Sequence, residues 1–134
     1  MSKSLIYVAN TTPIATPLDT AANLGTIIRR KSCDMSLSGN AINLTEAGYY
    51  DVDVAATFTG AAAGNVTLTL YKDGVAVPGA TATETITTAT TEFRSVGFHG
   101  VVRVGCCADS ALTVVVSGTT IPTINSIAVE VVRE

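Results

Sequence analysis

The stretch Tyr49-Tyr50-Asp51-Val52-Asp53-Val54-Ala55-Ala56-Thr57-Phe58 decides the fold class. Apolar residues occupy every second position from Tyr50 to Phe58, and the alternate positions carry mainly aspartate and threonine. A period of two is typical of a β-strand whose two faces meet different surroundings. We therefore expect an antiparallel sheet with one packed face and one wetter face.

The same alternation recurs along the chain and predicts an all-β, antiparallel jelly-roll sandwich of about 8–10 strands. No segment has the length and period of a helix. The further strands that the pattern predicts are Ser4–Asn10, Thr26–Lys31, Ala41–Leu44, Val66–Leu70, Val75–Pro78, Val96–Val104, Leu112–Val116 and Ile127–Val131.

Turn-forming residues punctuate this series. Asp73-Gly74 predicts a tight hairpin turn, because both residue types accept the positive φ that such a turn requires. Pro78-Gly79 is expected to end the strand that begins at Val75. Thr11–Gly25 is expected to be an irregular loop, and Gly60–Asn65 a flexible turn. The threonine-rich stretch Thr83–Thr91 is a strand or a loop, and we expect it to be covered or paired.

Length and charge restrict the molecule further. The chain has 134 residues, which predicts one domain over residues 1–134. Charged residues make up 14% of it, against about 25% in a typical soluble domain. So few charges favour burial of surface between subunits, with a neutral threonine-rich surface as the alternative.

Several partners and compartments are disfavoured by the same sequence. The net charge of −3 argues against a nucleic-acid partner. The apolar runs are too short for a signal-peptide core or a membrane span, so we expect synthesis in a cytoplasm without classical export and no membrane insertion.

Residue types that catalyse reactions or bind metals are few. His99, the single histidine, lies in a β pattern without a nucleophile motif, so we expect it on the wetter sheet face or at a subunit contact. Asp51 and Asp53 share a face and, with Asp34 or Asp109, offer oxygen ligands for Ca²⁺. They lack the spacing of a calcium loop, and a solvated strand face is the favoured interpretation.

The three cysteines indicate a reducing compartment. Their number is odd and Cys106 and Cys107 are adjacent, which does not suit a disulfide framework. The spacing of Cys33, Cys106 and Cys107 does not suit a zinc site either. We expect the adjacent pair to be small buried hydrophobic residues at a strand end, not needed for folding. No metal, cofactor or enzymatic activity is expected.

Three stretches carry a resemblance to a known family. Leu44–Val52 resembles the Gly-x-Tyr-x-Val strand of the tumour-necrosis-factor and complement-head jelly rolls. Val66–Ala80 resembles a hairpin of their bacterial relatives. Val101–Cys107, with Leu112–Val116 and Ile127–Val132, looks like the closing strands of phage and Firmicutes members of the exosporium-glycoprotein C-terminal type. The resemblance implies a homotrimer without catalytic residues, which caps collagen-like stalks on spores or stands on virions as a fibre or decoration protein.

The function expected from this resemblance is structural. Because no collagen tract follows Met1, a bacteriophage virion component is favoured, either a head-decoration or a fibre-type trimer. Its expected partners are other virion proteins of the capsid or tail, and a host-surface glycan or protein met by its loops. A bacterial cell- or spore-surface adhesion trimer of the same fold is the alternative.

Four residues are candidates for the trimer contact. Tyr49, Tyr71, His99 and Arg103 are expected on the mixed, non-core faces of their strands. The cores of protein interfaces favour aromatic anchors and contain few charges, and this mixed face carries aromatic side chains with few charges among them.

Overall fold

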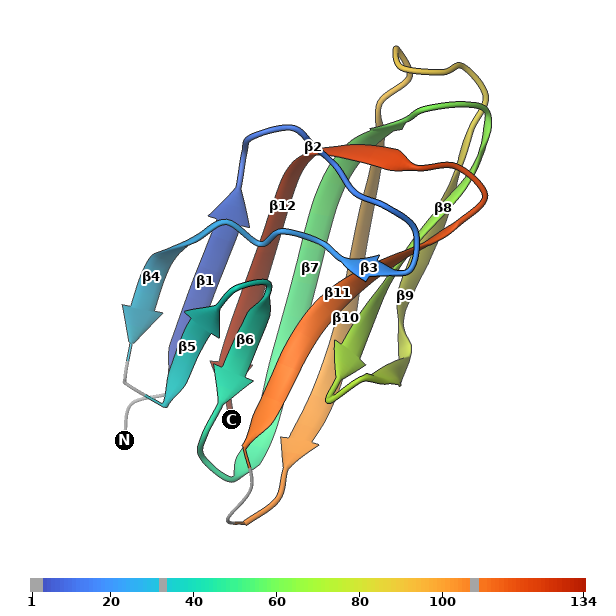
Figure 1. Ribbon diagram of the computed structural model, residues 1–134. Coiled ribbons are helices and arrows are strands. Elements are labelled where there is room, and N and C mark those ends of the chain that lie inside the picture. Colours follow the sequence, from blue (N-terminus) through green and yellow to red (C-terminus); the bar gives the residue numbers. More distant parts are fainter. Residues whose placement is uncertain (1–3, 32–33, 107–108) are drawn as a thin grey trace.

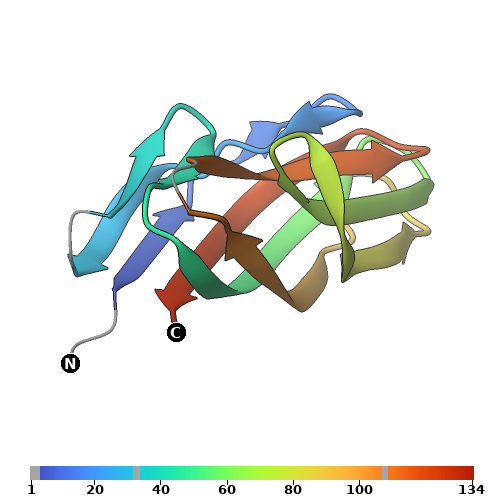
Figure 2. The same ribbon diagram turned by 90° about the horizontal axis from the view of Figure 1, so that it is seen from below.

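The fold is a sandwich of two antiparallel sheets (Figures 1 and 2). The computed structural model describes residues 4–31, 34–106 and 109–134. Sheet A has the order β10 (Arg94–Val104), β7 (Gly48–Gly60), β12 (Pro122–Arg133), β1 (Leu5–Asn10) and β4 (Thr26–Lys31), and β2 (Ile14–Ala15) pairs with β12. Sheet B has the order β5 (Met35–Ser38), β6 (Ala41–Leu44), β11 (Ser110–Gly118), β8 (Gly64–Lys72) and β9 (Val75–Ile86), and β3 (Thr20–Ala21) pairs with β11. The predicted all-β, antiparallel jelly-roll sandwich is confirmed.

The core fills the space between the sheets. In β7, the alternate residues from Tyr50 to Phe58 are at most 4% exposed, as their pattern predicted. They meet the inward residues of sheet B, which include Leu68 of β8 and Val114 of β11. The buried Tyr50 hydroxyl donates a hydrogen bond of 2.6 Å to the Glu46 carbonyl, and burial, followed by the charge of Asp34, raises the pKa of Tyr50.

The hairpin at Asp73-Gly74 is confirmed. β8 and β9 pair up to Lys72 and Val75, and the two turn residues have φ values of 52° and 81°. Positive φ at both central positions is the geometry of a type I′ turn, which matches the twist of the strands it joins.

Pro78-Gly79 does not end the strand that begins at Val75, contrary to expectation. β9 continues through this pair to Ile86, with a register shift opposite β8 between Thr69 and Tyr71. Among the described strands, β9 pairs only with β8, so a proline that lacks an N–H costs the ladder little at this edge. Gly79, with φ of 83°, accommodates the bulge.

Other boundaries also differ from the prediction. β5 was not predicted, and two-residue bridges, β2 and β3, interrupt the expected loop Thr11–Gly25. β12 begins at Pro122, five residues before the predicted start. The sequence pattern did not reveal these residues, because a register shift between Ile124 and Ser126 breaks the alternation. Strand extension also shortens the turn expected at Gly60–Asn65 to residues 61–63.

The expectation of buried cysteines is wrong for Cys106. It is exposed, because β10 ends at Val104 and the chain turns before β11. Cys33 and Cys107 lie outside the described residues.

Candidate functional site: the outward face of sheet A

The outward face of sheet A carries a continuous row of small residues. Strand pairing places Ala9 of β1 opposite Ala128 of β12, Ala128 opposite Ala55 of β7, and Ala55 opposite Gly97 of β10. We call these four residues the small row. It crosses four neighbouring strands, so the backbone of the sheet lies unusually close to the surface there.

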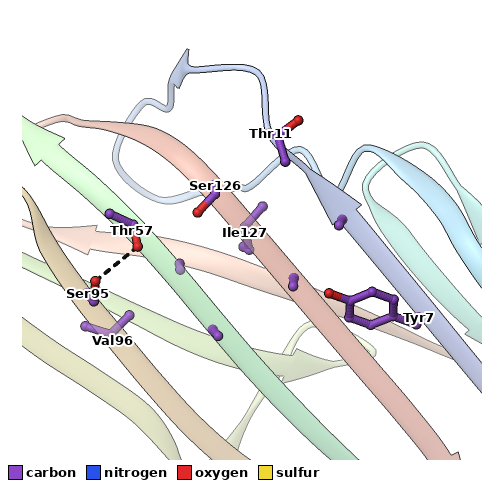
Figure 3. A pocket seen from close by; sticks show the side chains of 11 residues that line it. Tyr7, Thr11, Thr57, Ser95, Val96, Ser126 and Ile127 are labelled. Atoms are coloured by element: carbon purple, nitrogen blue, oxygen red, sulfur yellow. Dashed lines mark hydrogen bonds between the residues drawn. The ribbon is translucent and has the colours of Figure 1, made fainter.

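A shallow open hollow of about 420 Å³ lies over the small row (Figure 3). Its walls carry hydroxyl groups, and Thr57 and Ser95 join across β7 and β10 by a 3.0 Å hydrogen bond. The residues that line the hollow are Tyr7, Ala9, Thr11, Ala55, Ala56, Thr57, Ser95, Val96, Ser126, Ile127 and Ala128. This lining suits an apolar group with a polar rim.

A charged row runs beside the small row. It consists of Tyr7, Glu130, Asp53 and His99, which are cross-strand neighbours in that order. Glu130 and Asp53 bring like charges opposite each other, an arrangement that costs stability in an isolated sheet. His99 lies diagonally near Asp51, with 3.7 Å between Nε2 and Oδ1, and its side chain is half exposed.

Three of the four predicted contact residues share this face. Tyr49 pairs with Arg103 at one end of β7 and β10, and His99 lies four residues from Arg103 on the same strand. Tyr49 is 56% exposed, an unusual state for a large aromatic side chain. Tyr71 lies on β8 in sheet B, so the structure separates it from the other three.

The small row was missed by sequence reasoning. Alanine at alternate positions of a strand is an ordinary residue, and only the pairing of four distant strands makes a row of it. Gly97 was the available signal, because glycine inside a strand often marks a close approach by another group.

The geometry offers surface contact and no evident catalytic constellation. Among the described residues, no hydroxyl or thiol makes a hydrogen bond with His99, whose polar neighbour is Asp51. Asp51 and Asp53 share the outward face, as expected, but the described part of the chain holds no group of three histidine, cysteine or acidic residues placed to bind a metal ion. No helix in the described ranges is long and apolar enough to cross a membrane.

Comparison with known proteins identifies the fold. No family model and no curated protein matches the sequence. A crystal structure of murine APRIL at pH 5.0 matches with a TM-score of 0.69 and 10% identity, over 99% of this chain and 100% of that one. A second crystal structure of murine APRIL, at pH 8.5, matches with a TM-score of 0.63 and 12% identity over the same shares. The chain therefore has the jelly-roll fold of tumour-necrosis-factor-like domains.

Proposed function

We propose that the protein is a non-enzymatic structural protein that assembles as a homotrimer and forms part of a bacteriophage virion, as a head-decoration or fibre-type component. The outward face of sheet A forms the subunit contact. The observation that carries the proposal is the small row, which one subunit leaves uncovered.

Gly97 is the strongest single argument for a contact there. A Cβ atom at this position would meet nothing nearer than the Val54 carbonyl oxygen, at 3.8 Å. Packing within one subunit therefore does not require glycine, although glycine inside a strand costs about 0.5–1 kcal/mol relative to alanine. Close approach by a second molecule supplies the missing reason for a glycine at Gly97 and for the alanines beside it.

The edges of the two sheets support a contact near β10. The outer strand β5 has four residues, β4 carries Arg29, Arg30 and Lys31 in succession, and β9 contains Pro78. Short length, charge and proline are devices that prevent unwanted strand pairing. β10 has eleven residues and no proline, and its two arginines, Arg94 and Arg103, lie near its ends. A neighbouring subunit that covers β10 would remove this liability.

Threefold assembly is supported by the family that the sequence resembles, in which the domain is a trimer. In such a contact, Tyr49 and His99 lie at the edge of the buried face and the hollow receives an apolar side chain of the neighbour. Tyr71, on sheet B, lies outside this contact.

The place in a virion rests on the resemblance to phage members of that family. Two measurements test the proposal separately. Light scattering at micromolar concentration is expected to give a mass of about three times 13.7 kDa, and a monomer would overturn the homotrimer. Mass spectrometry of purified phage particles is expected to find the chain, and its absence there would overturn the virion role and favour the cell- or spore-surface alternative.

A further inference from the structure

A subunit contact on sheet A extends over the charged row as well as the small row. Ala128 and Glu130 are two residues apart in β12, as are Gly97 and His99 in β10, so the two rows lie about 7 Å apart along the strands. A stable contact buries about 800 Å² on each partner, far more than a single row of small residues occupies. Assembly through this face therefore removes the charged row from water.

The charged row does not balance its own charge. Glu130 and Asp53 lie directly opposite each other, and the salt bridges between described residues engage neither carboxylate. Arg29 of β4 pairs with Tyr7 and continues the row with one fixed positive charge. Two carboxylates and one guanidinium give the row a net charge of −1 while His99 is neutral. A proton on His99 brings this sum to zero.

The groups that face His99 are mainly acidic. Asp53 is its cross-strand neighbour in β7, and Nε2 of His99 lies 3.7 Å from Oδ1 of Asp51. Arg103, the basic residue of β10 on the same face, is four residues away. β9 packs behind β10 and has one charged residue, Glu84, which is in phase with the core side of its own sheet. The surroundings of His99 therefore favour its protonated form.

The cost of removing charges from water falls when the buried charges balance one another. Histidine is the side chain whose charge ordinarily changes between pH 5 and 8, and His99 is the single histidine of the chain. Its side chain is 52% exposed in one subunit, so water can deliver a proton to the ring before the contact forms.

We propose that His99 is a proton switch for assembly, in which each subunit takes up a proton on His99 as the sheet A contact forms. The inference rests on the proposed function, because it concerns the regulation of that contact. Its sign follows from linkage: the assembled state binds more protons than the separate subunits, so assembly is favoured as the pH falls from about 8 to about 6.

Sedimentation over a range of concentrations, at about pH 6 and about pH 8 and one ionic strength, tests this switch on a chain without a histidine tag. The concentration of half-assembly is expected to be at least about tenfold lower at the lower pH. His99→Gln should assemble as weakly at the lower pH as at the higher one. His99→Lys, with a permanent positive charge, should assemble tightly at both. Glu130→Gln removes one carboxylate from the row and should abolish the preference for the lower pH.

The matched control moves the histidine to the other sheet. His99→Gln combined with Thr83→His places the single histidine on the outward face of sheet B, beside Thr67, and assembly of this double variant should not respond to pH. Circular dichroism should show the same β structure for every variant at both pH values.

The switch is overturned if the natural trimer has the same concentration of half-assembly at both pH values. It is also overturned if His99→Gln keeps the pH dependence or if Thr83→His restores it. A chain that is monomeric at both pH values would overturn the homotrimer itself, so failure of the proposed function is distinguished from failure of the switch.

Discussion

A single side chain, that of Val54, decides whether the sandwich forms. It is 3% exposed and its cross-strand neighbours are Phe98 and Val129. Val54→Asp buries a carboxylate among apolar groups, at a cost of about 4 kcal/mol or more, so we expect an unfolded chain. Circular dichroism should show the loss of β structure, whereas Asp53→Ala, one residue away on the exposed face, should keep it.

The two glycines of β10 provide a sharper contrast. A Cβ atom at Gly100 would lie 2.8 Å from the Cβ atom of Ala80, whereas at Gly97 it would meet ordinary space. We expect Gly100→Ala to lower the free energy of unfolding by about 1–3 kcal/mol through overpacking. Gly97→Ala should leave the fold of the subunit intact and instead weaken assembly. Denaturant titration and light scattering of both variants separate the two effects. Equal loss of stability in the two variants would argue against the assigned role of Gly97.

Glu92 makes the turn between β9 and β10, residues 87–93, dependent on pH only in strong acid. Hydrogen bonds, chiefly from the Thr87 side chain, lower the pKa of Glu92 from 4.5 to about 2. A carboxyl group whose pKa is lowered by folding stabilises the fold above its ordinary pKa, and this contribution is lost as the pH falls through about 2. We therefore expect the amides of Thr87 and Thr88 to stay protected at pH 4 and to lose protection near pH 2. An NMR titration with a midpoint near 4.5 would contradict the arrangement, and Glu92→Gln should abolish the transition.

At the scale of the element, the strongly alternating strands could be predicted from sequence. β7, β8, β10 and β11 contain the predicted ranges and β6 has the predicted bounds, because one face of each is buried and the period of two survives. β4 also has the predicted bounds, although all six of its residues are exposed. Asp73-Gly74 was equally predictable, since few residue pairs tolerate positive φ twice in succession.

The remaining elements depend on neighbours that a single sequence does not reveal. Pro78 is tolerated because β9 lies at an edge, and the first half of β12 is obscured by the bulge near Asn125. β5 has only four residues and is recognised by its pairing with β6. The outward face of sheet A could be predicted only in part for the same reason. The positions of Tyr49, His99 and Arg103 on it follow from strand phase, whereas the small row exists only once β1, β12, β7 and β10 are aligned.

The two tyrosines test which sheet makes the subunit contact. Tyr49 lies on sheet A and Tyr71 on sheet B. Tyr49→Asp should weaken assembly by placing a charge at the edge of the contact, while Tyr71→Asp should have little effect. Both variants should keep a β-rich circular-dichroism spectrum, and sedimentation over a range of concentrations measures their assembly. The reverse order of effects would assign the contact to sheet B.

At the scale of the whole molecule, the two broad faces of the sandwich differ in their side chains. Sheet A presents the small row and the charged row, whereas the outward side of sheet B is lined by threonine pairs such as Thr67–Thr83 and Thr69–Thr81, which hydrogen-bond each other at 2.7 and 2.9 Å. Those hydroxyls are satisfied within the subunit and suit exposure to water. The proposed assembly thus buries the outward face of sheet A and leaves the outward face of sheet B exposed.

The most direct test of this arrangement is the mass of the assembly after a charge is placed in the small row. Ala55→Arg adds a long cation over the hollow without disturbing the core, and Thr83→Arg is the matched control on sheet B. Light scattering at micromolar concentration is expected to give about three times 13.7 kDa for the natural chain and for Thr83→Arg, and a folded monomer near 13.7 kDa for Ala55→Arg. A natural chain that is monomeric, or an Ala55→Arg variant that remains trimeric, would contradict the assignment of sheet A as the subunit contact.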